Sequence, residues 1–240
     1  MRRLFVLCSL LIVSVGVCAA QDTAKPWTDW TKKDAEKVLN DSAWGQTFAQ
    51  APAAAPDTTV VTRSGGAIAA DRMGESGENK GGKAINYRAR FLTAKPVREA
   101  FMRLVLLQQP NAPADLKTQL QGFIDRDFGD YLVVAFTVES EDPRAAKMAS
   151  MMFGRLNADV LKDKVFLERK DGKRANFIDY KPPLEDGMGA KFVFSRTLDG
   201  QPFLTAGADT LTFNLQLNEK QKISLRYKVS AMTYGGKLEY

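Results

Sequence analysis

Beyond residue 18 this chain contains no cysteine and no histidine. The 240-residue sequence has two cysteines, Cys8 and Cys18, and no histidine at all. A fold built from the rest of the chain is therefore stabilised without disulfides and without zinc sites of the usual ligand types. The same absence excludes thiolate nucleophiles and imidazole bases, so carboxylates, lysine and tyrosine are the main acid–base groups. We expect no cofactor.

Residues 1–20 have the pattern of an export signal. Two arginines are followed by an apolar run, and small residues at 18–20 come before Gln21. The apolar run is about 14 residues, shorter than the ~20 that a helix needs to span a bilayer. We expect cleavage before Gln21 and an exported protein, periplasmic or secreted, without a transmembrane span. Lipid modification of Cys18 stays open, although Val17 stands where lipoprotein signals resemble one another in carrying Gly, Ala or Ser.

The charge of the mature chain is mildly basic. Removing Arg2 and Arg3 from the 34 basic residues leaves 32, against 28 acidic ones. The two signs are interspersed without a run of five or six like charges, so neither nucleic-acid binding nor a polybasic membrane segment is indicated. The length suits one large domain or two small ones with a substantial core.

All three tryptophans, Trp27, Trp30 and Trp44, lie in the first part of the mature chain, 21–48. They flank a short helical pattern at 33–40, with apolar residues on one side. We expect 21–48 to be a helical docking segment that packs onto its own chain or onto an envelope protein partner. The three tryptophans are the candidate binding residues, because exposed tryptophans concentrate binding energy.

A linker is expected after this segment. Residues 49–56 are rich in alanine and proline, 58–62 form a short β-prone run, and 64–83 carry six glycines. We expect 49–83 to be a linker that includes a mobile loop, and 84–240 to form the globular domain.

The globular part is predicted to begin with a strand, two helices, a second strand and a third helix, in that order. The patterns predict a strand at 85–92, a helix from Pro96, a helix from near Pro113 to Phe128–Gly129, a strand at 131–139, and a Met-rich helix opened by Asp142–Pro143.

The remainder is predicted to be β. Strands at 164–169 and 174–180 flank Asp171–Gly172, a good hairpin turn, and 191–196 is another strand. Apolar residues alternate with polar ones at 210–217 and 223–229, which is typical of half-buried antiparallel strands. We predict an α+β fold, mainly an antiparallel β-sandwich of roughly immunoglobulin-like size with inserted helices. A single antiparallel sheet with the helices on one face is the alternative.

Two acidic clusters are candidate sites. Glu139, Glu141 and Asp142 gather where a strand meets a helix, and paired carboxylates can hydrolyse glycosides. Acidic residues at a helix N-terminus are also explained by capping and by the helix dipole.

Asp125, Asp127 and Asp130 offer oxygen ligands for a cation such as calcium, although Gly129 occupies the fifth position of the stretch. A helix end followed by a turn also explains this second cluster.

Met148, Met151 and Met152 recur at helical spacing in the predicted Met-rich helix. Thioethers suit Cu(I), but methionines at such spacing more often fill gaps in a core. We expect core packing for them.

Residues 30–44 read Trp-Thr-Lys-Lys-Asp-Ala-Glu-Lys-Val-Leu-Asn-Asp-Ser-Ala-Trp. This stretch resembles the opening of a group of uncharacterised predicted exported bacterial proteins. The resemblance implies a bacterial envelope setting and no particular chemistry. We expect a non-enzymatic binding or structural module of the envelope. The alternative is a carboxylate-based hydrolase acting on an envelope polysaccharide.

Overall fold

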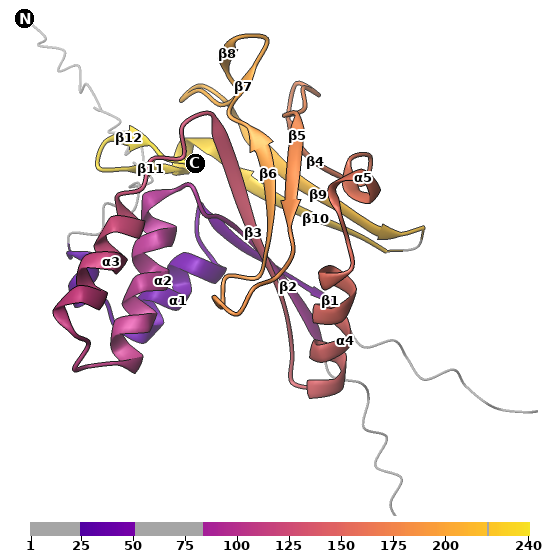
Figure 1. Cartoon of the computed structure of the whole chain (residues 1–240). Coiled ribbons are helices and arrows are strands. Elements are labelled where there is room, and N and C mark those ends of the chain that lie inside the picture. The colour runs from indigo at the N-terminus through magenta and orange to yellow at the C-terminus, as the bar shows by residue number, and fades with distance from the viewer. Residues whose placement is uncertain (1–24, 51–83, 220) are drawn as a thin grey trace, which may run out of the picture.

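The computed structural model describes residues 25–50, 84–219 and 221–240, so the expected signal and most of the expected linker lie outside the described residues. Two antiparallel sheets dominate the described part (Figure 1). The five-stranded sheet has the order β1-β2-β3-β6-β5, with bounds Gly45–Gln50 (β1), Ile85–Phe91 (β2), Tyr131–Ser140 (β3), Ala190–Ser195 (β6) and Phe177–Lys181 (β5). The three-stranded sheet has the order β10-β9-β4, with bounds Gln221–Lys228 (β10), Thr210–Asn218 (β9) and Val165–Arg169 (β4).

Helices and short hairpins complete the described part. The α-helices are Lys32–Asn40 (α1), Lys95–Gln108 (α2), Ala114–Ile124 (α3), Pro143–Gly154 (α4) and Ala158–Leu161 (α5). Single 3-10 turns are Trp27–Asp29 (η1) and Val229–Ala231 (η2), and the short hairpins pair Thr197–Leu198 (β7) with Gln201–Pro202 (β8) and Thr233–Tyr234 (β11) with Lys237–Leu238 (β12). The α+β class is confirmed, whereas an immunoglobulin-like sandwich is not established.

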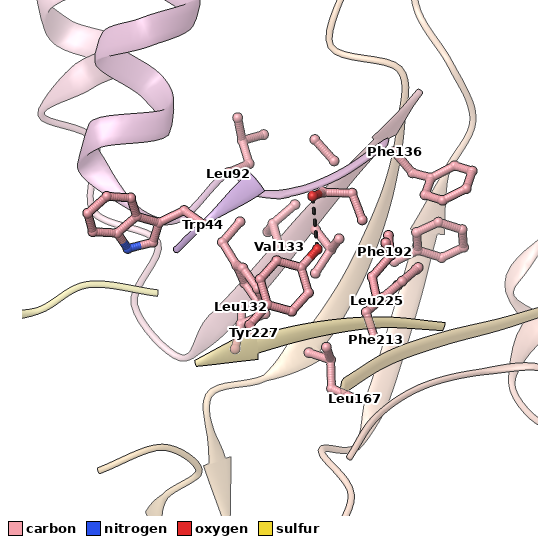
Figure 2. Close-up of a cluster of buried hydrophobic side chains, with 14 of the residues drawn as sticks. Trp44, Leu92, Leu132, Val133, Phe136, Leu167, Phe192, Phe213, Leu225 and Tyr227 are labelled. Carbon is pink, nitrogen blue, oxygen red and sulfur yellow. Dashed lines mark hydrogen bonds between the residues drawn. The ribbon is translucent and has the colours of Figure 1, made fainter. Parts of the chain in front are cut away.

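The main core lies between the two sheets. Residues that alternate along β9 and β10 turn one side chain in two toward the larger sheet, as the period of two predicts. The Phe213 ring lies 5.9 Å from Phe136 and 5.6 Å from Phe192, and Figure 2 shows these rings together. The Tyr227 hydroxyl donates to the Ala89 carbonyl at 2.9 Å, which satisfies a polar group inside this apolar layer. We call this side of the five-stranded sheet its inner face.

Helices α1 and α2 lie against the opposite, outer face at the β1-β2 side. Helix α1 begins with a capping box, in which Thr31 and Asp34 exchange hydrogen bonds. At the other end of α1, the buried Arg90 of β2 donates from Nε to the Leu39 carbonyl at 2.9 Å and from Nη2 to Asn40 at 2.8 Å. These bonds join the end of the helix to the outer face of the sheet.

The tryptophan segment belongs to the same folded unit. Strand β1 pairs with β2 along all of its length, from Gly45↔Arg90 to Gln50↔Ile85. Trp30 is 1% exposed and Trp44 is 3% exposed. A Cβ on Gly45 would lie 2.1 Å from the Leu39 carbonyl oxygen, so the close approach of β1 to α1 requires glycine.

The C-terminal hairpin fastens helix α2. Helix α2 has no side-chain cap from its own N-terminal residues, and the Glu239 carboxylate accepts from the Lys95 amide at 3.2 Å instead. The Glu239 carbonyl also accepts from Trp44 Nε1 at 2.8 Å. Glu239, which follows the C-terminal hairpin, therefore joins the end of the chain both to Trp44 and to the start of α2.

Two expected boundaries are wrong, because residues 45–50 form strand β1 rather than the end of a helical segment and the start of a linker, and α3 ends at Ile124 rather than near Phe128–Gly129. Two predictions about packing are also wrong. The Asp171–Gly172 turn forms, with Gly172 at φ +82°, but the strand after it does not pair with β4 beyond a single bridge. Instead β5 pairs with β6 in the larger sheet, where Tyr180 packs on Phe192 at 5.2 Å. The apolar side chains of β5 find better partners across the fold than in the adjacent strand.

The expected methionine core is the second error. Met148, Met151 and Met152 are 72%, 48% and 40% exposed. Helix α4 buries Phe153 against the sheet and turns the methionines outward. The expected opening of this helix is confirmed, since Asp142 caps it by accepting from the Arg144 amide at 2.9 Å.

We predict that Trp44→Ala lowers the free energy of unfolding by about 3–5 kcal/mol, because it leaves a cavity and removes the bond to the Glu239 carbonyl. Urea unfolding followed by far-ultraviolet circular dichroism measures the change. Trp27→Ala is the matched control, with a smaller loss, because Trp27 is only half-buried. An equal loss in both variants would contradict the prediction.

Glu99 gives a pH-dependent prediction. Burial raises the pKa of the Glu99 carboxyl above its ordinary value, although the Tyr234 hydroxyl donates to it at 2.6 Å. A raised acid pKa stabilises the fold most at low pH, and this stabilisation is lost as the pH rises through the folded-state pKa. Glu99→Gln removes the charge and keeps an acceptor, so its stability relative to the wild type should increase from about pH 4 to about pH 8. Urea titrations across this range test it, and a difference that does not change with pH would refute it.

Candidate functional site

An open groove of about 510 Å³ lies on the outer face of the five-stranded sheet. Most of its lining residues come from β3, β5 and β6 and from the end of α3 with the segment that follows it. Its lining is mostly apolar and comes from Leu92, Phe123, Phe128, Tyr131, Val133, Ile178, Met188 and Val193.

The register of the strands builds the groove floor. Val133 of β3 lies opposite Val193 of β6, and Val193 lies opposite Asp179 of β5. These residues form one row across the outer face. Tyr131 is 50% exposed and Ile178 is 47% exposed, so the floor continues into apolar surface open to solvent.

Charged side chains line the edge of this floor. The next row of the sheet places Lys191 directly opposite Lys181. Like charges directly opposite each other destabilise a sheet. Here the repulsion is reduced, because each lysine has its own acidic partner. Lys191 pairs with Asp186 at 2.7 Å, and Lys181 pairs with Asp179 at 2.6 Å.

Arg126 is the fifth charged residue of the groove. Its guanidinium lies 5.4 Å from the centre of the Phe128 ring, and within the described residues it forms no ion pair. The groove therefore has an apolar floor and a net positive edge, with the unpaired charge on Arg126. Such a surface can hold a molecule with an apolar body and one acidic group.

The structure separates the roles of the predicted catalytic carboxylates. Glu139 accepts from Arg88 at 2.6 Å, and Arg90 lies 3.9 Å from it. Asp142 caps α4, and Glu141 is an exposed residue. Glu139 is thus in an ion pair and Asp142 satisfies a helix N-terminus, the role that capping predicts for it.

Two of the three predicted metal ligands are used within the fold, and the third, Asp130, is exposed. Asp125 pairs with Lys95 at 2.9 Å and accepts from Gln121 at 2.6 Å. Asp127 accepts from the Gly129 amide at 2.8 Å, which forms a turn. Across the described ranges no group of three His, Cys, Asp or Glu residues is placed to hold a metal ion.

The candidate binding tryptophans lie within the fold of their own chain. Trp44 and Trp30 are buried, and Trp27 packs on the core at its edge. Trp30 Nε1 donates to the Lys25 carbonyl at 3.1 Å. Trp30 and Trp44 therefore cannot contact a partner while this fold persists.

Sequence reasoning missed the groove. The one available signal was the continuous apolar run of β3, which carries apolar residues on both faces. Such a run indicates a strand covered on both sides. Helices cover it only in part, and the remainder of its outer face, at Tyr131 and Val133, lines the groove.

Comparisons with known proteins add little to this geometry. No protein-family model matches the chain, and no curated protein matches it. A similar solved structure is that of a novel protein of unknown function from Burkholderia pseudomallei K96243. It is 17% identical, with a TM-score of 0.41, and the match covers 59% of this chain and 74% of that one. None of the helices in the described ranges has the length and apolar character needed to cross a bilayer.

Proposed function

We propose that this protein is an exported, non-enzymatic binding module of the bacterial envelope, and that the groove binds an anionic amphiphile such as a long-chain fatty acid. The observation that carries the proposal is the apolar floor at Val133 and Val193 beside the unpaired guanidinium of Arg126. The envelope setting comes from the signal pattern at 1–20.

The size and shape of the groove support this class of ligand. Small-molecule sites commonly have volumes of about 300–1,000 Å³, with mostly apolar walls and a few polar groups that orient the ligand. The groove has a volume of about 510 Å³ and is open along one side, which suits an extended chain. An acyl chain against Val133 and Val193 removes apolar area from water, and a carboxylate beside Arg126 gains a charge-assisted hydrogen bond.

The hydrolase alternative is less well supported. A carboxylate pair needs an acid and a base that face the substrate from two sides. Here Glu139 is engaged by Arg88, and Asp142 is engaged by the N-terminus of α4. We therefore place the function in the groove rather than at these carboxylates.

We predict that Arg126→Gln weakens fatty-acid binding about tenfold, because one charge-assisted hydrogen bond is lost. Displacement of a fluorescent fatty acid from the chain beginning at Gln21 measures the affinity. The same assay with the matching fatty alcohol is the control, and its affinity should be unchanged by the substitution. A wild-type protein that binds neither ligand would refute the proposal.

A second variant tests the floor of the groove. Val193→Lys places a charge on the half-buried Val193 position of the groove floor, so binding of the acid and of the alcohol should both fall at least about tenfold. Lys228→Gln, an exposed change on β10, is the matched control and should leave both affinities unchanged. Thermal unfolding checks that each variant retains its fold, and retained binding in a folded Val193→Lys protein would place the ligand elsewhere.

A further inference from the structure

Helix α4 presents an unusual surface to solvent. Met148, Met151 and Met152 are exposed, although methionine is usually buried. The helix also exposes two cations, Arg144 and Lys147, and the exposed Arg155 follows its last residue. The helix itself carries no acidic residue.

The spacing places the methionines together on one flank. Met151 and Met152 follow Met148 by three and four residues, which are neighbouring positions on a helix surface. Arg144 precedes Met148 by four residues, and Arg155 follows Met151 by four, so both arginines continue the same flank. We call Arg144, Lys147, Met148, Met151, Met152 and Arg155 the α4 face.

The cations of the α4 face have no acidic partners within the described part of the chain. Arg144, Lys147 and Arg155 take part in none of its ion pairs. Of the two acidic residues that precede the helix, Asp142 is directed to the amide of Arg144 as the helix cap, and Glu141 lies before that cap. The α4 face thus combines three exposed methionines with three cations.

We propose that the α4 face docks on an anionic lipid bilayer. Three cations complement acidic headgroups, and three flexible thioether side chains enter the boundary between headgroups and acyl chains. No run of basic residues marks this surface in the sequence. The helical period gathers charges that lie at 144, 147 and 155.

The charges of this surface favour a membrane over a soft metal. Three thioethers at this spacing suit Cu(I), but the neighbouring cations repel a positive ion and attract anionic lipid. The proposal is independent of the groove, because the α4 face and the groove share no residue. Docking here would bring the protein to a surface that contains acidic amphiphiles.

The first experiment measures co-sedimentation of the chain beginning at Gln21 with vesicles. Vesicles of phosphatidylcholine containing about one-third phosphatidylglycerol should bind the protein, and pure phosphatidylcholine vesicles should not. Added salt should weaken the binding, because it screens the attraction between the cations and the lipid. Equal binding to both kinds of vesicle would overturn the proposal. Binding to neither would also overturn it, and this is the result expected if the α4 face binds an acidic protein instead.

Variants then locate the surface. Arg144→Gln, Lys147→Gln and Arg155→Gln together should weaken binding about a hundredfold, at about fivefold for each charge. The matched control removes three exposed cations from α1 and α3, Lys33→Gln, Lys37→Gln and Lys117→Gln, which lie at the other side of the molecule (Figure 1). An equal loss in both triple variants would overturn the proposal, because net charge alone would then explain the binding.

Variants of the three methionines distinguish apolar contact with the bilayer from a role of the sulfur atoms. Replacing Met148, Met151 and Met152 with glutamine should weaken vesicle binding at least about fivefold, and replacing them with leucine should preserve it. Circular dichroism melting confirms the fold of each variant, and these exposed positions tolerate both changes. Loss of binding in the folded leucine variant, or none in the glutamine variant, would contradict the proposal.

Discussion

The guanidinium of Arg90 lies buried between helix α1 and the outer face of the five-stranded sheet. Burial lowers the pKa of Arg90 to about 10, which is still well above neutral pH, so the guanidinium stays charged. Nε and Nη2 bond to the end of α1, while Nη1 donates to Thr137 of β3 at 3.0 Å. A cation near the C-terminus of a helix is also favoured by the helix dipole. One side chain thus fixes where the helical layer meets the sheet, since its buried donors would lose their partners if α1 moved.

The position of α1 determines what remains uncovered. Helix α2 packs beside α1, and the Arg103 side chain of α2 donates to the Trp30 carbonyl at 2.6 Å. These helices cover the β1-β2 side of the outer face, and α3 ends at Ile124, beside the open part. The strands β6 and β5 extend past this layer, so their outward residues meet solvent. The groove is therefore a consequence of a wide sheet carrying a narrower helical layer. Its floor keeps the apolar character of a covered strand, which is why an apolar ligand suits it.

Local patterns predicted much of the fold, because short-range physics decides those elements. The alternation in β9 and β10, the helical pattern of α1 and the Asp142 cap of α4 are all observed. Pairing across long distances was harder. Strand β5 pairs with β6, where Tyr180 packs on Phe192. The hairpin prediction used only the residues around Asp171–Gly172 and could not include this distant contact. Strand β1 was missed because its alanine and glutamine resemble the Ala/Pro segment that follows. The groove could not be predicted, since it depends on the width of one layer relative to another.

The exposure of the methionines on α4 follows from how little that helix must bury. Phe153 is 2% exposed, lies 5.2 Å from Phe136, and its carbonyl accepts from the Tyr180 hydroxyl at 2.7 Å. The half-buried apolar residues at 145, 146 and 149 of α4 are alanines. The methionines therefore have no place in the core, and their presence at the surface needs another cause. Exposed apolar area is costly in water unless something covers it. The same flank of α4 carries cations without acidic partners. An anionic lipid surface would pair with these cations and would also cover the exposed methionines.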